Sequence, residues 1–520
     1  MTATTSEETA RTAGRGGVAV LGAKVFFLVV GFAQQPLLRL AVGLNDFGSL
    51  AQALVVANTV NNVVVSSGTQ GVSRVVAGAP GHEDEALRAA LRVHLPLAVL
   101  VAAVMAASGP IYARFEHAQD VIAPLAVLAG VALLYGVYAP AIGYLNGRNR
   151  FGRQAALDVT FATLRTIGLV GLGYLFVARG MSGVLGTTVG WVAAAACIVP
   201  LAARSTGLGK ALAPGAPRPA SVPTSGQYVA LLLPIAGAQL CTNVLLQIDI
   251  ALLGRFLSDG AAAAGVAGAQ GRDAVRSWVA IYKECQTFAF LPYQLLFSIT
   301  LVLFPMLARA RADGDEAAVR AYVARGARLA AVFGGLMVGV VVAMPGAMLT
   351  FAYGAADAAR GADVLRVMAL GQGAFAMLGI ATTVLTSLGR EGTAAWVTLG
   401  AVGAVTVACA LLVPGAEFGQ AQLVRSAEAT GGALLATLLV AGVLVRRRTG
   451  AFIPAATSAR VALALAVCVG AGLAMPRFAR LATPAVALVT GAGYVALLIL
   501  TRELGAEDLA SVRALVSKRR

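Results

Sequence analysis

The stretch FGSLAQALVVANTVNNVVVSSGTQGVS, residues 47–73, decides the fold. It runs for 27 residues without a formal charge, which is long enough for a helix to cross a bilayer. Polar residues nevertheless recur in it, mainly at every third or fourth position: Asn58, Asn61, Asn62, Ser66, Thr69 and Ser73. That spacing places them along one face of a helix. Because unpaired amides are costly in hydrocarbon, we expect this face to meet a wet cavity or polar neighbours.

The composition of the whole chain indicates a polytopic α-helical membrane protein. Of its 520 residues, 58% are hydrophobic and 12% are charged, whereas about 25% of the residues in a soluble domain are charged. The 60 glycines suit close packing of helices in lipid. The five cysteines lie in or beside apolar segments, and their spacing suggests neither disulfides nor a zinc site.

A spanning helix needs about 20 mainly apolar residues, and the sequence offers about fourteen such segments. They are 18–42, 47–76, 93–113, 121–145, 156–178, 181–203, 227–254, 284–308, 328–352, 364–388, 393–414, 426–445, 459–476 and 481–501. The eighth contains Pro292 and Pro305, which can kink a spanning helix.

The basic residues orient these segments. If the N-terminus is cytoplasmic, most of the 40 lysines and arginines fall in the cytoplasmic connections, as the positive-inside rule requires. The net charge of +16 is therefore interpreted as a topology signal and as contact with anionic lipid headgroups, not as a nucleic-acid surface. We expect a multi-pass protein of the cytoplasmic (inner) membrane with both termini in the cytoplasm.

A proline-rich stretch divides the chain. Residues 204–226 contain four prolines and predict a cytoplasmic linker. The linker separates an N-terminal lobe of six helices (1–203) from a C-terminal lobe of six (227–445). A final helix pair with a basic tail follows (446–520). Two six-helix lobes with the same orientation are expected to be pseudo-symmetric about an axis along the membrane normal.

Polar residues concentrate in the first two helices of each lobe, which predicts a central cavity lined by those four helices. The candidate residues for binding a substrate or ion are Lys24, Arg39, Asn58, Asn61, Asn62, Gln239, Asn243, Gln247, Asp249 and Gln294. Gln239, Asn243 and Gln247 follow one another at steps of four and would share one helix face. They can line the cavity or simply hydrogen-bond neighbouring helices.

Ionisable residues within spans are rare and mark functional sites. Arg39 and Asp249 each lie near the outer end of the first helix of a lobe. We hypothesise that Arg39 binds an anionic substrate group and that Asp249 pairs with it or accepts a proton or cation. Lys24 is either functional or snorkels to the interface. Arg165 and Asp158, seven residues apart on one helix face, suggest a structural charge pair.

No catalytic constellation accompanies these polar residues. The sequence contains no HExxH, P-loop or GxSxG motif, and its three histidines are scattered in or near loops. We therefore expect neither an enzyme nor a metal site nor a resident cofactor. Coupling to Na⁺ or H⁺ is left open.

Three segments resemble oligosaccharide-lipid flippases of the Wzx type, within the multidrug/oligosaccharidyl-lipid/polysaccharide (MOP) exporter superfamily. GGVAVLGAKVFFLVVGFAQQPLLRLAVGLNDFGSLAQALVVANTV (16–60) resembles the family's opening, with Arg39 and Phe47-Gly48 in characteristic places. LPIAGAQLCTNVLLQIDIALLGRFLS (233–258) resembles its seventh helix, with Asp249 at an acidic position, and YKECQTFAFLPYQLLFSITLVLFPMLARA (282–310) resembles its eighth. The segment 259–284 is longer than the family's usual connection and suggests an extra outer helix.

The resemblance implies two lobes around an alternating-access cavity that moves undecaprenyl-diphosphate-linked oligosaccharide from the inner to the outer leaflet, for polysaccharide, O-antigen or exopolysaccharide biosynthesis. Lys24 and Arg39 would then bind the diphosphate, since guanidinium groups match phosphate oxygens. The final helix pair would extend a groove for the lipid tail. The implied partners are the lipid-linked oligosaccharide, membrane lipids, and polymerase or glycosyltransferase components of the same pathway.

Three other functions remain open from the sequence. A lipid II flippase has the same architecture, but its cavity is usually richer in arginine. A cation-coupled multidrug antiporter of the superfamily often has an acidic residue in its first helix, whereas 18–42 contains only Lys24 and Arg39 as charged residues. A non-transporting scaffold of a polysaccharide assembly complex would not need the polar stripe. The glycan, the lipid carrier and the oligomeric state are not determined by the sequence.

Overall fold

The computed structural model describes residues 3–207, 219–266, 268–476 and 478–505, without the side chains of 3–21, 24, 295–298, 301, 302 and 305. Residues 208–218 of the predicted linker and residues 506–520 of the basic tail lie outside these residues. Within them the chain is helical, with 17 α-helices and two short 3₁₀-helices and without a strand, which confirms the all-α prediction. The chain forms two compact units, Met1–Ala280 and Ile281–Arg520.

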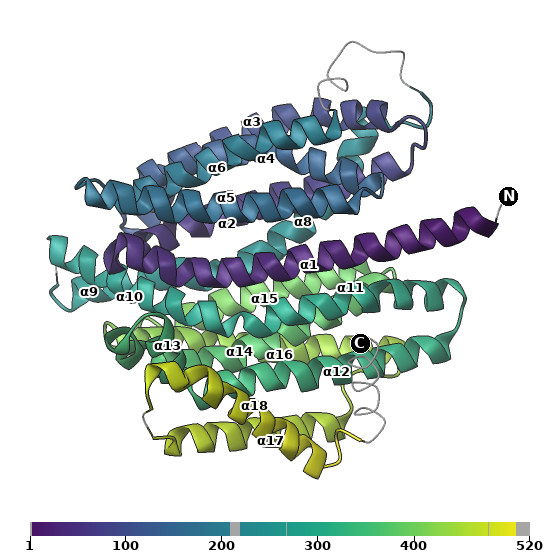
Figure 1. Ribbon diagram of the computed structural model, residues 1–520. Coiled ribbons are helices and arrows are strands. Elements are labelled where there is room, and N and C mark those ends of the chain that lie inside the picture. The colour runs from purple at the N-terminus through teal and green to yellow at the C-terminus, as the bar shows by residue number, and fades with distance from the viewer. Residues whose placement is uncertain (1–2, 208–218, 267, 477, 506–520) are drawn as a thin grey trace. The chain divides into compact units, whose positions relative to one another are not determined.

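The described part of the first unit contains eight α-helices, one short 3₁₀-helix and the first half of a ninth α-helix (Figure 1). They are α1 (Ala3–Val42), α2 (Leu44–Ala77), α3 (Glu83–Glu116), η1 (Gln119–Val121), α4 (Ile122–Gly147), α5 (Phe151–Ala178), α6 (Gly183–Thr206), α8 (Ser225–Leu245), α9 (Ile248–Ala263) and α10 (Gly268–Ala289).

Glycines let the helices of the first unit touch at their backbones. A Cβ atom on Gly168 of α5 would lie 2.4 Å from the carbonyl oxygen of Gly190 in α6, and one on Gly190 would lie 2.0 Å from that of Gly168. A Cβ on Gly143 of α4 would lie 2.7 Å from the carbonyl oxygen of Thr69 in α2. Such close crossings are how helices associate in lipid, where burial of apolar surface gives no driving force between them.

An aromatic cluster fills the interior of the first unit. Tyr135 and Tyr138 of α4 pack against Phe161 of α5, with ring centroids 5.8 and 5.3 Å from it. Trp191 of α6 donates a hydrogen bond from Nε1 to the hydroxyl of Tyr135 at 3.0 Å, so its buried indole is satisfied.

The described part of the second unit contains the rest of α10, eight further α-helices and one short 3₁₀-helix. They are α11 (Leu291–Ala312), α12 (Glu316–Ala343), α13 (Pro345–Ala352), α14 (Ala355–Ser387), α15 (Glu391–Leu412), α16 (Gln420–Thr449), α17 (Ala455–Ala474) and, after η2 (Arg480–Ala482), α18 (Thr483–Leu500).

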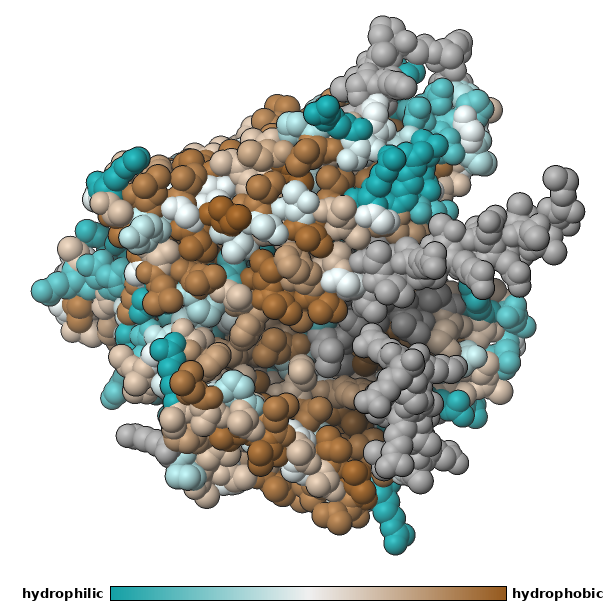
Figure 2. Space-filling view, viewed as in Figure 1, coloured by the Kyte–Doolittle hydropathy of each residue, from teal (hydrophilic) through white to brown (hydrophobic). Residues whose placement is uncertain are grey.

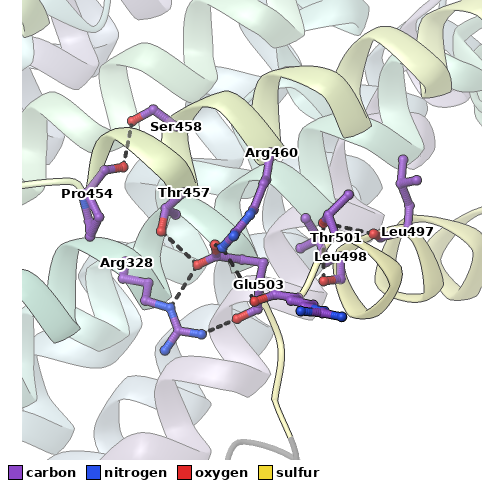
Figure 3. A network of polar contacts seen from close by, with 10 residues as sticks. Arg328, Pro454, Thr457, Ser458, Arg460, Leu497, Leu498, Thr501 and Glu503 are labelled. Carbon is purple, nitrogen blue, oxygen red and sulfur yellow. Dashed lines mark hydrogen bonds and ion pairs between the residues drawn. The ribbon is translucent and has the colours of Figure 1, made fainter.

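A polar network anchors the C-terminal helix pair to α12. The carboxylate of Glu503, just after α18, accepts hydrogen bonds from Arg328 of α12 and from Arg460 and Thr457 of α17 (Figure 3). Tyr494 of α18 also packs on α12, where a Cβ on Gly335 would lie 2.2 Å from the tyrosine hydroxyl. The pair is therefore held at its polar end and along its length.

Thirteen helices in the described part of the chain are long and apolar enough to span a membrane. They match the fourteen predicted segments except the eighth, 284–308, which is not among them. Large apolar side chains on these helices face outward, among them Leu40, Ile111, Trp396, Leu411 and Leu488, each more than 70% exposed. Apolar side chains likewise cover much of the face drawn in Figure 2. Exposed apolar belts of this kind fit contact with lipid rather than water.

Three predicted spans are wrong as single continuous helices. Segment 284–308 breaks at Phe290, because Pro292 lacks the N–H that a continuous helix would need and instead lies in the first turn of α11, which begins at Leu291. Segment 328–352 breaks at Met344 for the same reason, since Pro345 begins α13. Segment 227–254 breaks at Leu246–Gln247 between α8 and α9.

The compact units divide the chain at a different place from the predicted lobes. Helices α8 and α9 follow the linker in sequence but pack on α2 and α3, so they belong to the first unit. The lobes 1–203 and 227–445 and the C-terminal segment 446–520 are defined by the expected internal repeat. Their boundaries stay a prediction.

Candidate functional site

The polar face of α2 meets α8. Nδ2 of Asn62 donates a hydrogen bond to Oδ1 of Asn243 at 2.9 Å. Nδ2 of Asn243 in turn donates to the backbone oxygen of Gln239 at 2.8 Å, which fixes the orientation of the amide. The structure therefore brings together two of the predicted polar helices, one from each side of the linker, through an amide–amide contact. We call Asn58, Asn61, Asn62, Gln239 and Asn243 the amide seam.

Within the amide seam, Asn61 is the unusual member. Its side chain is 1% exposed, and neither its oxygen nor its nitrogen has a hydrogen-bond partner within the described part of the chain. Leaving a buried polar group unsatisfied costs about 1–3 kcal/mol. Asn58 is half-buried, whereas Asn62 keeps accessible surface beside its bond to Asn243. The seam thus combines a paired amide, an unsatisfied amide and exposed polar surface in one candidate membrane span.

The Asn62–Asn243 hydrogen bond predicts a measurable coupling. Asn62→Leu and Asn243→Leu should each destabilise the protein, and the double variant should cost less than the sum, with a coupling of about 0.6 kcal/mol, the average for hydrogen bonds between membrane helices. Unfolding in mixed micelles of increasing denaturing-detergent fraction measures it. Gln70→Leu, on the exposed surface of α2, combined with Asn243→Leu is the control and should be additive. Additivity in the Asn62 pair would contradict the contact.

Gln247 and Asp249 lie beyond the end of α8, the helix that carries Gln239 and Asn243. The expectation that Gln239, Asn243 and Gln247 share one helix face is wrong for Gln247, because α8 ends at Leu245 and Gln247 is the N-cap of α9. Asp249 lies in the first turn of α9, where a carboxylate favours helix initiation through the helix dipole. Its side chain is 2% exposed, and Oδ1 accepts a hydrogen bond from the backbone N–H of Ile250 at 2.9 Å.

Of the two charged residues predicted to act in α1, only Arg39 has a side chain that the structure describes. Arg39 lies in the last turn of α1 with a half-buried side chain. The side chain of Lys24 lies outside the described residues. Gln294 lies in the first turn of α11, in the second compact unit, with an exposed side chain.

Arg165 occupies the aromatic cluster. Its guanidinium lies over the ring of Phe27, 4.9 Å from the centroid, and 5.8 Å from that of Trp191. Asp158 accepts a hydrogen bond from the hydroxyl of Tyr138 at 3.4 Å. Stacking on two aromatic rings stabilises a cation through their quadrupoles and favours a structural role for Arg165.

The structure also contains a cavity that the sequence analysis did not predict. Its volume is about 500 Å³, and its walls come from α2, η1, α9 and α10. We call it the α9–α10 cavity; the polar residues that line it are Gln52, His117, Asp120, Ser258, Asp259, Arg272 and Arg276. The only signal in the sequence was the unusual length and charge of residues 259–284, which here form the end of α9 and most of α10.

Contacts of α9 with α3 and of α10 with α2 position the walls of the α9–α10 cavity. Helix α9 caps the C-terminus of α3, since Nη1 of Arg255 donates to the carbonyl of Phe115 at 3.1 Å and Oγ of Ser258 donates to that of Glu116 at 2.8 Å. Gly48 of α2 lets α10 approach, because a Cβ there would lie 2.0 Å from the carbonyl oxygen of Arg276.

Comparisons with solved structures identify the fold. The chain is similar to the lipid II flippase MurJ in its inward closed conformation, with a TM-score of 0.70 at 11% identity, over 94% of this chain and 99% of that one. It is similar to an inward-facing MATE multidrug resistance transporter of the MOP superfamily, with a TM-score of 0.60 at 14% identity, over 83% and 98% of the two chains. A MOP superfamily transporter from Pyrococcus furiosus has a TM-score of 0.59 at 14% identity, over 83% and 95%.

No family model matches the sequence, and no curated protein matches it either. At 11–14% identity the structural likeness establishes the fold and nothing finer. The chain therefore has the fold of MOP-superfamily transporters, a class that includes both a lipid flippase and multidrug transporters.

Proposed function

We propose that this protein is a flippase that moves undecaprenyl-diphosphate-linked oligosaccharide from the inner to the outer leaflet of the cytoplasmic membrane by alternating access. The observation that carries the proposal is Asn61. Its buried amide has no partner among the described residues and lies in the same span as Asn62, which pairs with Asn243, so it carries a cost in stability. A substrate that brings its own hydrogen-bonding groups offsets that cost.

The amide seam favours a neutral, hydroxyl-rich substrate group. Amides both donate and accept hydrogen bonds, as sugar hydroxyls do. The seam contains no carboxylate that would attract a cationic drug, and the charged residues of segment 18–42 are both basic. Arg39 and Lys24 suit the diphosphate, because a cation offsets the phosphate charge and a guanidinium can bind two phosphate oxygens at once.

Two other transport functions remain as alternatives. A lipid II flippase has a closely related substrate and a neighbour of the same fold. A multidrug antiporter coupled to Na⁺ or H⁺ also has neighbours of the same fold. A non-transporting scaffold of a polysaccharide assembly complex is the alternative of a different class. The first two alternatives have structural neighbours of their own function, whereas the lipid-linked oligosaccharide is proposed from the residues of the amide seam.

The proposed role of Arg39 gives a test of diphosphate binding. Arg39→Ala should lower the rate of leaflet transfer roughly tenfold or more, because a charge-assisted hydrogen bond to phosphate contributes about 1.5–3 kcal/mol. Arg39→Lys should retain part of the rate, since it keeps the charge and loses the two-pronged contact. Arg114→Ala, on the exposed surface of α3, is the control. Full activity of Arg39→Ala would remove this residue from the substrate site.

The substrate itself is tested in liposomes of defined composition. Purified full-length protein is reconstituted with one of three probes: a fluorescent undecaprenyl-diphosphate oligosaccharide, fluorescent lipid II, or a cationic dye. Protein-dependent transfer of the first probe at the highest rate supports the proposal. Faster transfer of lipid II would favour the first alternative. Dye efflux without lipid transfer would favour the antiporter, and no movement of any probe would favour the scaffold.

A further inference from the structure

The last residue of α3, Glu116, has a fully buried carboxyl group. One of its oxygens, Oε1, accepts a hydrogen bond from the hydroxyl of Tyr112, one turn earlier in the same helix. The other oxygen, Oε2, is buried and has no hydrogen-bond partner within the described part of the chain. A buried carboxylate is strongly disfavoured unless hydrogen bonds and a counter-ion compensate its charge.

Helices α2 and α9 cover this carboxyl group. The amide of Gln52 in α2, whose side chain is 1% exposed, hydrogen-bonds Glu116. On α9, a Cβ added to Gly254 would lie 2.7 Å from Oε2 of Glu116 and 3.2 Å from Nε2 of Gln52, so no side chain separates the helix from either group. Oγ of Ser258 holds α9 in this position, since it donates to the backbone oxygen of Glu116 at 2.8 Å.

The cations of the surrounding helices have other partners. Arg255 of α9 pairs with Asp259 at 2.9 Å, and the exposed ring of His117 contacts these same two residues. Arg276 of α10 pairs with Asp120 of η1 at 3.0 Å. Among the residues that the structure describes, none of these cations forms an ion pair with the carboxyl group at the end of α3.

The remaining electrostatic effects also oppose a negative charge on Glu116. The carboxylate of Asp120 lies close enough to repel it. The C-terminus of a helix carries the negative end of the helix dipole, which disfavours an anion there as well. Burial, the missing counter-ion and these two effects all favour the neutral, protonated form.

A proton on Oε2 would also suit the hydrogen bonding of the cluster. It converts Oε2 from an acceptor without a donor into a donor. Two further buried oxygens in the cluster lack a donor in the described chain, Oε1 of Gln52 and Oδ2 of Asp120. Oε1 of Glu116 would remain the carbonyl oxygen that accepts from Tyr112.

We propose that Glu116 is a proton-binding site, which holds a proton on Oε2 while α9 covers it and releases that proton to water when α9 moves away. The fully buried carboxyl cannot exchange its proton with solvent while α9 is in place. The ionised form, in turn, needs water to compensate its charge. Proton release and displacement of α9 therefore favour each other.

This inference rests on the proposed function for its use, because it would couple proton movement to alternating access. Helix α9 follows α8 after the junction at Leu246–Gln247, so a shift of α9 can reach the helix that carries Asn243 of the amide seam. On the predicted orientation the end of α3 lies at the outer side of the membrane, where the proton would be exchanged.

Infrared difference spectroscopy of the full-length protein, in a detergent without ester groups, tests the protonation state. A protonated carboxyl group has a C=O stretching band that an ionised one lacks. At neutral pH this band should be lost in Glu116→Gln. It should be unchanged in the control Glu428→Gln, since Glu428 is exposed and pairs with Arg425 at 2.8 Å. No loss of the band in Glu116→Gln would overturn the inference.

Tyr112→Phe gives a second test that keeps the carboxyl group. It removes the hydroxyl that donates to Oε1 of Glu116. The protonated-carboxyl band should then shift to higher frequency, because a C=O group without a hydrogen-bond donor has a stronger double bond. An unshifted band in Tyr112→Phe would overturn the inference even if Glu116→Gln failed to fold.

Leaflet transfer in liposomes with an imposed proton gradient tests the coupling. The gradient should change the initial rate in the wild type and in Glu428→Gln, and this response should be lost in Glu116→Gln. An equal response in Glu116→Gln, or none in the wild type, would overturn the coupling.

The two kinds of measurement also separate this inference from the proposed function. If the infrared band is assigned to Glu116 but no lipid-linked oligosaccharide is transferred, the proton site stands and the proposed function fails. Transfer of that lipid by a protein without the band would do the reverse.

Discussion

Gly168→Leu is expected to prevent the protein from reaching its folded state in useful amounts. A Cβ on Gly168 would lie 2.4 Å from the carbonyl oxygen and 3.1 Å from the carbonyl carbon of Gly190, so α5 and α6 would have to move apart along their whole contact. Overpacking against a side chain typically costs 1–3 kcal/mol. Here the obstacle is backbone, which cannot change rotamer, so we expect a cost of at least about 3 kcal/mol.

The matched control lies in the same helix. A Cβ on Gly171 would have nothing within 4 Å, so Gly171→Leu adds the same side chain to α5 without a clash. Fluorescence-detected size-exclusion chromatography should show a monodisperse peak for Gly171→Leu and aggregate or no peak for Gly168→Leu. Equal peaks with equal melting temperatures would mean that α5 and α6 do not cross at this point.

Glu503→Gln is expected to loosen the C-terminal helix pair. The Glu503 carboxylate is 2% exposed and pairs with Arg328 and Arg460, each at 2.8 Å, so the substitution leaves two partly buried cations without their anion (Figure 3). Removing one member of a buried ion pair costs about 3–5 kcal/mol. Because both arginines keep roughly a third of their side chains exposed, we expect about 2 kcal/mol.

The pH dependence distinguishes this network from simple packing. Burial alone would raise the pKa of Glu503, but the hydrogen bonds from Arg328, Arg460 and Thr457 outweigh it and hold the pKa below its usual value of 4.5. A carboxylate whose pKa is lower in the folded state contributes stability above pH 4.5, and this is lost as the pH falls through the folded-state pKa.

Thermal melting followed from neutral pH into that acidic range measures the effect. The difference in melting temperature between the wild type and Glu503→Gln should be full at neutral pH and shrink toward zero in acid. Glu428→Gln is the control, since Glu428 pairs with Arg425 on an exposed surface, where an ion pair contributes at most about 1 kcal/mol. A pH-independent difference for Glu503→Gln would show that the charge of Glu503 does not hold the pair.

The sequence predicted the fold class because spanning helices have a strong signal in composition and length. It predicted only one of the three helix breaks. Pro292 marked one break in advance, since proline removes a backbone donor. The break at Leu246–Gln247 has neither proline nor glycine at the junction. Gln247 is there the N-cap of the next helix, α9. That break moved Gln247 and Asp249 off the helix that carries Gln239 and Asn243.

The candidate site was predictable only in part. The spacing of the asparagines in α2 indicated a polar face, and Asn62 does contact a polar residue of α8. Spacing along one helix cannot say which residue lies opposite Asn62. It also cannot say that the neighbouring Asn61 is buried without a hydrogen-bond partner in the described part of the chain. The α9–α10 cavity was not predictable, because Gln52, Asp120 and Arg276 come from three separate elements that only tertiary packing brings together.

We propose that the amide seam serves the transfer of a lipid-linked oligosaccharide. The most direct measurement is the initial rate at which a fluorescent undecaprenyl-diphosphate oligosaccharide changes leaflets in liposomes containing the wild type, Asn61→Leu or no protein. Asn61→Leu removes a buried amide that has no hydrogen-bond partner among the residues that the structure describes, so the fold should keep or gain stability while transfer falls about tenfold. Wild-type liposomes that transfer this lipid no faster than empty ones, or a fully active Asn61→Leu, would contradict the account.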